Sequence, residues 1–180
     1  TGIALASNPD INGLFFTGSM EVGMILHKQF AGHPDKILAL ELGGNNPLIV
    51  HEASDINAAV LLTIQSVFMT SGQRCTCTRR LIVVEGGNTE AYLSKLVEVA
   101  SNLRIGAYNE TPEPFAGPLI NMVEADKIVA GYEKLVAGGG KVLLAQKRLH
   151  APHPFLSPAI VDVTKSTGRD DQEYFGPLLQ

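Results

Sequence analysis

Cys75 is the first residue of the chain that could carry out covalent chemistry. It lies in the polar turn Thr70–Thr76, directly after a long helical pattern, and not on an apolar stripe. An ordinary cysteine has a pKa near 8.5, so only about 3% of it is thiolate at pH 7. A nucleophilic Cys75 therefore needs surroundings that favour the anion, or a nearby base. The alternative interpretation is a buried structural thiol.

The two neighbours of Cys75 that could change its reactivity are Arg74 and Cys77. Successive residues of an extended chain point to opposite sides, so Arg74 need not lie beside the thiol, whereas Cys77 shares its side if the segment is extended. The pair could form a strained reversible disulfide. We interpret Cys77 instead as a thiol that packs in the core.

Glu41 is the second candidate, because it is a lone carboxylate in the apolar run Ile37–Leu42 and immediately precedes Gly43-Gly44. Burial would raise its pKa toward the range useful to a general base. The alternative is that the strand is exposed at an edge and Glu41 faces water. The two glycines could let the backbone approach a reacting centre, or could simply form a turn.

Two further patterns carry weaker signals. The segment Gly18–Gly23 lies between an expected strand and an expected helix, where a helix N-terminus can bind phosphate, although a tight turn explains it equally well. His150 and His153 could suggest a metal site together with the cysteines, but prolines flank both histidines and nothing completes a tetrahedral set. We therefore predict no metal site.

The elements that must position these residues alternate between short apolar runs and longer amphipathic patterns, which is typical of an α/β protein with a largely parallel sheet. Ser19 and Asp55 are expected N-caps, and Asn121 opens a capping-box variant. The expected strands are residues 13–17, 37–42, 48–50, 80–84 and 141–145, and the expected helices are 20–30, 56–68, 89–103 and 122–137.

Composition excludes several classes of partner. The 180 residues suffice for one sizeable domain, or a domain plus a piece of another. A net charge of −4 lacks the basic excess of nucleic-acid-binding proteins, and no apolar stretch approaches the ~20 residues that cross a bilayer. Two closely spaced cysteines fit a reducing compartment, so we expect a cytoplasmic protein. Both ends look cut, and we expect a piece of a longer chain that self-associates and is inactive alone.

Four motifs occur together in order and spacing, and Cys75 lies 34 residues after Glu41. In this respect the sequence resembles the aldehyde dehydrogenase superfamily, and the resemblance covers essentially the whole chain. Two segments, Glu41–Pro47 and Gly72–Arg80, are most similar to a branch that oxidises a semialdehyde in arginine catabolism. The four motifs are Phe16–Ser19 with Gly23, Glu41–Gly44, Gly72–Thr76 and Glu173–Pro177.

The resemblance implies a three-layer α/β catalytic domain with a mostly parallel sheet over residues 43–180, and the last part of a Rossmann-like cofactor domain over residues 1–42. It implies that Cys75 is the nucleophile and Glu41 the base in the oxidation of an aldehyde through a thiohemiacetal and a thioester. The cofactor would be NAD, with NADP also possible. The backbone N–H of Cys75 could donate to the oxyanion.

The resemblance also implies a small aldehyde substrate, a homo-oligomer and a set of cofactor contacts. Two alternative functions remain: a folded binding or assembly module without turnover, and a semialdehyde dehydrogenase that acylates coenzyme A. Glu41, as a hydrolytic base, argues against the second. The residues expected to contact the cofactor are Gly18, Ser19, Gly23, Leu42, Glu173 and Phe175.

Overall fold

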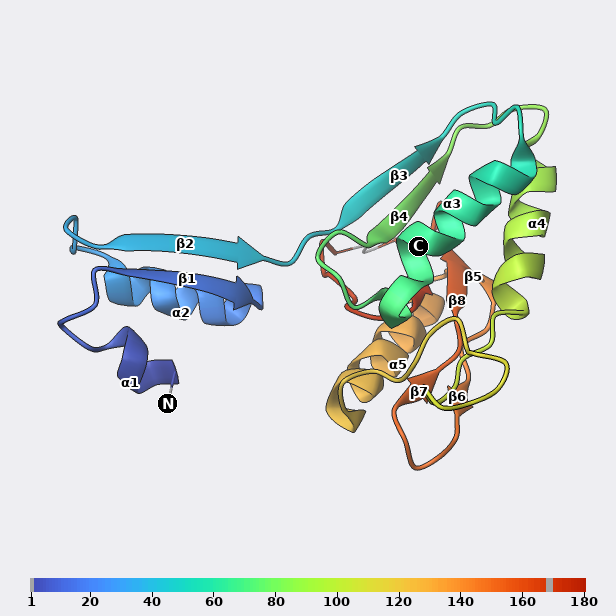
Figure 1. The fold of residues 1–180 in the computed structure, drawn as a ribbon. Coiled ribbons are helices and arrows are strands. Elements are labelled where there is room, and N and C mark those ends of the chain that lie inside the picture. Colours follow the sequence, from blue (N-terminus) through green and yellow to red (C-terminus); the bar gives the residue numbers. More distant parts are fainter. Residues whose placement is uncertain (1, 168–169) are drawn as a thin grey trace. The chain divides into compact units, whose positions relative to one another are not determined.

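The chain is organised as two compact units, Thr1–Gly44 and Asn45–Gln180, in a computed structural model that describes residues 2–167 and 170–180 (Figure 1). The unit boundary expected from the sequence lay between residues 42 and 43. The structure divides the chain two residues later, directly after the Gly43-Gly44 pair that follows Glu41 and Leu42.

The first unit is a parallel β–α–β arrangement preceded by a short helix. Its elements are α1 (Gly2–Ala6), β1 (Gly13–Gly18), α2 (Met20–Phe30) and β2 (Ile37–Leu42). β1 and β2 pair in parallel from Gly13 opposite Ile37 to Gly18 opposite Leu42, and α2 covers one face of the pair (Figure 1). The carboxyl ends of both strands and the N-terminus of α2 therefore meet at one edge of this unit.

The sequence explains why α2 forms and how it packs. The Ser19 hydroxyl accepts a hydrogen bond from the Val22 N–H at 3.3 Å, and Glu21 places a carboxylate in the positively polarised first turn. Leu26 and Phe30 are buried on the face toward the strands. The small core of this unit consists of Ala6, Leu26 and Phe30, with Ile11, Leu14, Phe16, Leu38 and Leu40 packed around them.

The second unit contains one composite sheet. β3 pairs in parallel with β4, β8 pairs in parallel with β9, and β5 runs antiparallel to β8. Two hydrogen bonds connect β4 to the chain end: Gln180 N–H donates to Arg79 O at 3.1 Å, and Leu81 N–H donates to Gln180 O at 2.8 Å. This alternation is that of a parallel pair, so the strands follow one another as β3-β4-β9-β8-β5. The bounds are β3 (Asn46–Val50), β4 (Thr78–Val83), β5 (Lys141–Leu144), β8 (Ala159–Asp162) and β9 (Leu178–Leu179).

Helices and a small hairpin complete the second unit. The Asp55 carboxylate caps α3 by accepting from Ala58 N–H at 3.0 Å, and the Asn121 side chain caps α5 by accepting from Glu124 N–H at 2.9 Å. The hairpin pairs β6 (Arg148–Leu149) with β7 (Phe155–Leu156). The helices are α3 (Ile56–Phe68), α4 (Thr89–Ser101) and α5 (Met122–Ala137).

Helices cover both faces of this sheet. Successive residues of a strand point to opposite faces, so neighbouring residues pack against different helices. Ile160 and Leu179 join a core cluster with α3 and α4, whereas Val161 and Leu178 join another with α5. The second unit is therefore a three-layer α/β structure with a mostly parallel sheet, as the resemblance implied (Figure 1).

Two strands begin earlier than their hydropathy suggests. β3 spans Asn46–Val50 where a strand over residues 48–50 was expected, and β4 is the second. The apolar pattern predicted a strand over residues 80–84, but β4 spans Thr78–Val83. Thr78 and Arg79 are polar and yet buried, with only 4% and 1% of their surface exposed. Their polarity hid the start of the strand, and the burial of Arg79 matters for the site described next.

Candidate active site

The turn that carries Cys75 has an uncommon backbone conformation. After α3, the short 3-10 helix η1 (Met69–Gly72) contains Thr70 and Ser71, each with φ of 55°, and Gly72 with φ of +70°. The left-handed region costs a residue with a Cβ roughly 1–2 kcal/mol. Contacts from the rest of the unit must therefore hold this turn, a situation common at functional sites.

Polar side chains of the turn supply such contacts with the loop that precedes α5. The Ser71 hydroxyl donates to Gly117 O at 2.6 Å. The Gln73 amide donates to Pro118 O at 3.2 Å and accepts from Ile120 N–H at 3.0 Å. Both ends of the Gln73 amide group are thus used, which fixes the backbone just before Cys75.

Gly72 brings the turn against a second segment of the chain. A Cβ at this position would lie 2.3 Å from Gly176 O, well inside van der Waals contact. Only glycine allows this approach of two backbones, and its positive φ adds to the requirement. The motif around Cys75 and the motif Glu173–Pro177 therefore pack directly on each other.

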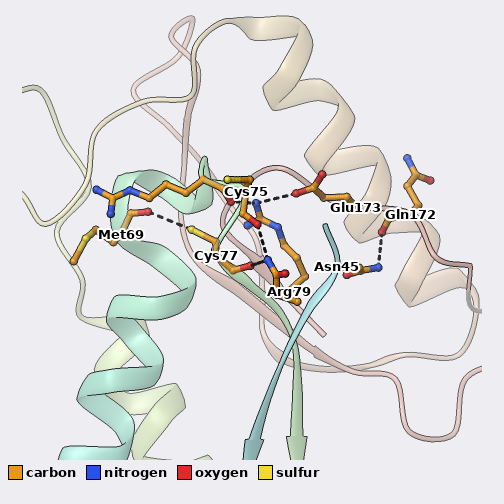
Figure 2. A network of polar contacts seen from close by, with 9 residues as sticks. Asn45, Met69, Cys75, Cys77, Arg79, Gln172 and Glu173 are labelled. Atoms are coloured by element: carbon orange, nitrogen blue, oxygen red, sulfur yellow. Dashed lines mark hydrogen bonds and ion pairs between the residues drawn. The ribbon is translucent and has the colours of Figure 1, made fainter. Parts of the chain in front are cut away.

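The two cysteines occupy different environments. Both are free thiols, with Cys75 exposed and Cys77 buried at 3% exposure, its Sγ 3.9 Å from Met69 O (Figure 2). The Asn46 amide donates to Cys75 O at 2.6 Å and to Cys77 O at 3.0 Å. One amide therefore holds the backbone on both sides of Thr76 and leaves the Cys75 thiol free to meet a ligand.

Arg79 links the cysteine turn to Glu173 (Figure 2). One guanidinium nitrogen of this buried side chain donates to Arg74 O at 2.9 Å and lies 3.4 Å from Glu173 Oε1. The guanidinium carbon lies 5.1 Å from the centre of the Phe175 ring, a cation–π distance. The arginine thus contacts the backbone next to Cys75 and both residues of the last motif that were expected to bind cofactor.

The segment around Glu173 is also held from its other side. Asn45 donates to Asp171 Oδ1 at 3.2 Å. The same amide nitrogen donates to Gln172 O at 3.3 Å (Figure 2). The Tyr174 ring packs on α5 so closely that a Cβ at Gly131 would lie 2.3 Å from it. Burial raises the pKa of the Tyr174 hydroxyl, and the nearby charge of Asp170 adds to the effect.

An ion pair anchors the beginning of the same segment to α5. Lys134 donates to Asp170, and this hydrogen bond lowers the pKa of the Asp170 carboxyl and raises that of the Lys134 ammonium. Arg80, the exposed neighbour of Arg79, adds a bond of 3.0 Å to Asp171 Oδ1. Glu173, with its side chain 21% exposed, therefore lies on a segment fixed at both ends.

The remaining predicted site residues lie in the first unit. Glu41 lies near the carboxyl end of β2 and is exposed, so of the two interpretations the one with Glu41 facing water describes this structure. Ser19 caps α2 at the same edge. A Cβ at Gly23 would lie 2.6 Å from Leu42 Cδ2, so α2 needs glycine there to approach β2. Gly18 is paired with Leu42 across the strands.

The structure therefore gathers the predicted residues into two groups. Cys75, Glu173 and Phe175 come together in the second unit, and Gly18, Ser19, Gly23, Glu41 and Leu42 gather at one edge of the first. Sequence reasoning missed Asn46 and Arg79. A signal for Arg79 was present: two consecutive arginines in a strand must point to opposite faces, so one of them had to turn inward.

The described residues, 2–167 and 170–180, contain no group of three or more histidines, cysteines or carboxylates able to hold a metal ion. Among the same residues, no helix has the length and apolar character needed to span a membrane.

Sequence comparison matches the whole chain to one family. The model described as "Aldehyde dehydrogenase family" matches residues 1–180. N-succinylglutamate 5-semialdehyde dehydrogenases from Pseudomonas fluorescens and Chromobacterium violaceum are 53% and 52% identical to the chain over 180 residues. The match covers 100% of this chain and 37% of each of these curated relatives.

Solved structures agree with the sequence comparison. Succinate-semialdehyde dehydrogenase from Burkholderia pseudomallei is 36% identical with a TM-score of 0.86, covering 99% of this chain and 36% of its own. A Thermus 1-pyrroline-5-carboxylate dehydrogenase with bound NAD is 28% identical with a TM-score of 0.88, covering 99% and 35%. A glyceraldehyde-3-phosphate dehydrogenase from Methanocaldococcus jannaschii complexed with NADP is 32% identical with a TM-score of 0.85, covering 99% and 37%.

Proposed function

Because the chain belongs to the aldehyde dehydrogenase family, we propose that the protein carrying it oxidises an aldehyde to a carboxylic acid, with Cys75 as nucleophile and Glu41 as general base. The chain spans 37% of the length of its curated relatives, so this activity is proposed for the whole protein. The first unit would contribute to the cofactor-binding domain and the second to the catalytic domain.

The main structural support for the proposal is the exposed thiol and the fixed backbone of the Cys75 turn. Its thiol is exposed, while the backbone around it is held by Asn46, Gln73 and Arg79. A packing cysteine would have its sulfur inside the core, as Cys77 does. An exposed thiol on a strained turn with fixed backbone is the arrangement that nucleophilic catalysis requires.

The chemistry follows from the residue types. The Cys75 thiolate attacks the aldehyde carbon, a C–S bond forms, and the carbonyl oxygen becomes the oxyanion of a thiohemiacetal. The Cys75 N–H would donate to that oxygen. Once the thiohemiacetal has been oxidised to a thioester, the Glu41 carboxylate takes a proton from water, which attacks the acyl carbon. The C–S bond then breaks, and the acid leaves with the thiolate restored.

The residues present fit a nicotinamide cofactor. When bound, it accepts the hydride that the thiohemiacetal carbon releases. The first turn of α2 leaves backbone N–H groups directed at the edge where β1 and β2 end, a suitable place for a pyrophosphate. Glu173 is partly exposed, so its carboxylate can accept hydrogen bonds from ribose hydroxyls. The contact between Arg79 and Oε1 holds this carboxylate in place. The pyrophosphate site would be formed by Gly18, Ser19, Gly23 and Leu42. The ribose site would be formed by Glu173 and Phe175.

The substrate we propose is N-succinylglutamate 5-semialdehyde, the compound in the names of relatives that are 52% and 53% identical to this chain. This semialdehyde carries two carboxylates, one on the α-carbon and one on the succinyl group. Arg74 is exposed next to Cys75, and its guanidinium has no ion pair within residues 2–167 and 170–180. It is therefore available to a substrate carboxylate.

This use of Arg74 can be tested by substitution. Arg74→Gln should raise the KM for the succinylated semialdehyde roughly tenfold, the value of one charge-assisted hydrogen bond, and leave the KM for propanal unchanged. Arg74→Lys should restore most of the difference. An equal change for both aldehydes in Arg74→Gln would remove Arg74 from substrate recognition.

We also propose a cytoplasmic protein that forms a homo-oligomer. Two free cysteines separated by one residue suit a reducing compartment. Several large apolar side chains of the first unit, among them Ile3, Phe15 and Ile37, are more than half exposed and would be covered by other parts of the assembled protein.

The test of the function is NADH formation by the full-length protein with a panel of aldehydes, in the presence and absence of coenzyme A. We expect the succinylated semialdehyde to give the highest kcat/KM, with release of the free acid. Formation of an acyl-coenzyme A in place of the acid would favour the acylating alternative. No oxidation of any aldehyde would favour a binding module and contradict the proposal.

A further inference from the structure

Arg79 is the most deeply buried charged side chain near the candidate site. It is 1% exposed, whereas the side chain of the adjacent Arg80 is 39% exposed and pairs with Asp171 at the surface. A buried guanidinium is retained at a large desolvation cost and needs partners that compensate for it. Those partners show what Arg79 does.

The first partner is the peptide unit that contains the Cys75 N–H. Arg79 donates to Arg74 O at 2.9 Å, and this carbonyl belongs to the same peptide group as the nitrogen of Cys75. A cation bonded to the carbonyl polarises the amide, which makes its N–H a stronger donor, because hydrogen bonds in a chain reinforce one another. The contact also fixes the plane of the peptide. Arg79 thus acts on the group that would hold the oxyanion.

The second partner is Glu173. Its Oε1 lies 3.4 Å from the guanidinium nitrogen, and the Phe175 ring lies against the same guanidinium at 5.1 Å. The carboxylate therefore has a fixed partner on one oxygen. Both partners are served by the same terminal nitrogen of Arg79, which carries two N–H donors at the end of a planar, rigid group.

We propose that Arg79 is a positioning residue that ties the Cys75 backbone to Glu173, so that one buried guanidinium orients both the oxyanion donor and the ribose ligand. The inference rests on the proposed function. The guanidinium acts through these two groups and does not itself touch substrate or cofactor. Its Nε and second terminal nitrogen have no hydrogen-bond partner among the described residues, so its hydrogen bonds there are those with Arg74 O and Glu173.

The two roles predict separable effects. Loss of the contact with Glu173 should weaken cofactor binding, and loss of the contact with Arg74 O should slow the chemical step. Arg79→Met keeps the length of the buried stem and removes both contacts. Arg79→Lys keeps the charge, but its side chain ends one atom short of the terminal nitrogen that makes both contacts. Arg148→Met is the matched control, because Arg148 lies in the same unit but pairs with Asp126 on the surface.

The experiment uses the full-length protein with these three variants, with circular dichroism to check folding. NADH affinity comes from fluorescence titration, and kcat and the KM for NAD come from the oxidation of the succinylated semialdehyde. Arg79→Met should weaken NADH binding and lower kcat, each by roughly tenfold to a hundredfold, as expected when one partner of a buried charged contact is removed. Arg79→Lys should lie between, and Arg148→Met should match the parent protein.

A double-substitution cycle with Glu173→Ala separates positioning from general loss of structure. In the Glu173→Ala background, Arg79→Met should have little further effect on NADH affinity, because the carboxylate that Arg79 contacts is already gone, but should still lower kcat through Arg74 O. A purely structural role would add the same loss of affinity in both backgrounds, and that result would overturn the proposal. If Arg79→Met fails to fold, Arg79→Lys is tested in the same cycle.

The outcome also distinguishes this inference from the proposed function. If the parent protein binds NADH and oxidises the semialdehyde, but the folded Arg79 variants match Arg148→Met, only the role of Arg79 is wrong. If the parent protein neither binds NADH nor oxidises any aldehyde, the proposed function is wrong and the role of Arg79 is overturned with it.

Discussion

The turn that carries Cys75 and the strand end that carries Glu41 are built in opposite ways. The backbone around Cys75 is fixed by the side chains of Asn46 and Arg79 and by the turn's own Gln73, which bonds to the loop before α5, and Gly72 packs on Gly176. Glu41 is exposed, and its carboxylate makes no hydrogen bond within the described residues 2–167 and 170–180. The second unit by itself therefore fixes the nucleophile, whereas the first unit leaves the Glu41 side chain free to rotate.

This difference fits the two proposed roles. A nucleophile must meet the substrate carbon in a defined direction, and misplacement is costly. A base that acts on a water molecule later in the cycle needs access to solvent, and a free side chain provides it. The variants below therefore first remove the side chains of Cys75 and Glu41 and then the contacts that hold the Cys75 turn.

The largest effect is expected from Cys75→Ala. It removes the atom that forms the covalent bond, so oxidation should fall by at least roughly a thousandfold. Cys77→Ala is the matched control, because Cys77 is a buried thiol two residues away, and this variant should keep most of the activity. Initial rates of NADH formation measure both. Equal losses in the two variants would contradict the distinction between the cysteines.

Glu41→Gln should leave the first half of the reaction intact. The thioester would form and release NADH in an amount equal to the enzyme, and turnover would then stall, with the steady rate lowered roughly a hundredfold or more. Stopped-flow absorbance of NADH reveals the burst. A linear, unslowed progress curve would remove Glu41 from the mechanism.

Gly72→Ala tests the close packing of the turn on the segment that contains Glu173. The added Cβ would lie 2.3 Å from Gly176 O at a φ of +70°, so we expect a loss of roughly 2–4 kcal/mol in the free energy of unfolding. Gly139→Ala is the control, because Gly139 also has a positive φ but has no atom within 4 Å of an added Cβ. Its cost should be about 1–2 kcal/mol, the backbone strain alone.

Denaturant titration of the two glycine variants gives the comparison. Gly72→Ala should also lower kcat, since it displaces the backbone beside Cys75, and Gly139→Ala should not. Equal stability losses in the two variants would show that the contact between the two motifs contributes nothing beyond the left-handed backbone.

Asn46→Ala should give the smallest effect of this series. It removes two hydrogen bonds to Cys75 O and Cys77 O but leaves Arg79 and Gln73 in place, so kcat should fall by roughly tenfold. Asn88→Ala is the control, because the Asn88 amide donates to Ala53 O at 2.6 Å in another loop of the same unit. If Asn46→Ala matches Asn88→Ala in kcat, the amide is not needed to hold the nucleophile.

Local signals predicted the elements of this fold well. The helix over residues 20–30 begins at the residue after Ser19, and Asp55 and Asn121 cap their helices, because capping and amphipathic spacing act within a few residues. The start of β4 was missed because Thr78 and Arg79 are polar residues buried by distant partners.

The contacts that assemble the site could not be predicted from local patterns. Arg79 pairs with Glu173, 94 positions further along the chain, and Gly72 needs its lack of a side chain because of Gly176 O. The family resemblance indicated which residues would do chemistry. It did not indicate that a buried arginine joins two of the motifs, since that depends on the paths of both segments in three dimensions.

The central claim is that Cys75 forms a covalent acyl intermediate that Glu41 helps to hydrolyse. The most direct test is mass spectrometry of the full-length Glu41→Gln protein after mixing with N-succinylglutamate 5-semialdehyde and NAD, followed by peptide mapping. We predict an acyl adduct on the peptide that contains Cys75, located on that residue by fragmentation, and formed only when NAD is present. An adduct on Cys77, or no adduct despite NADH release, would contradict the account.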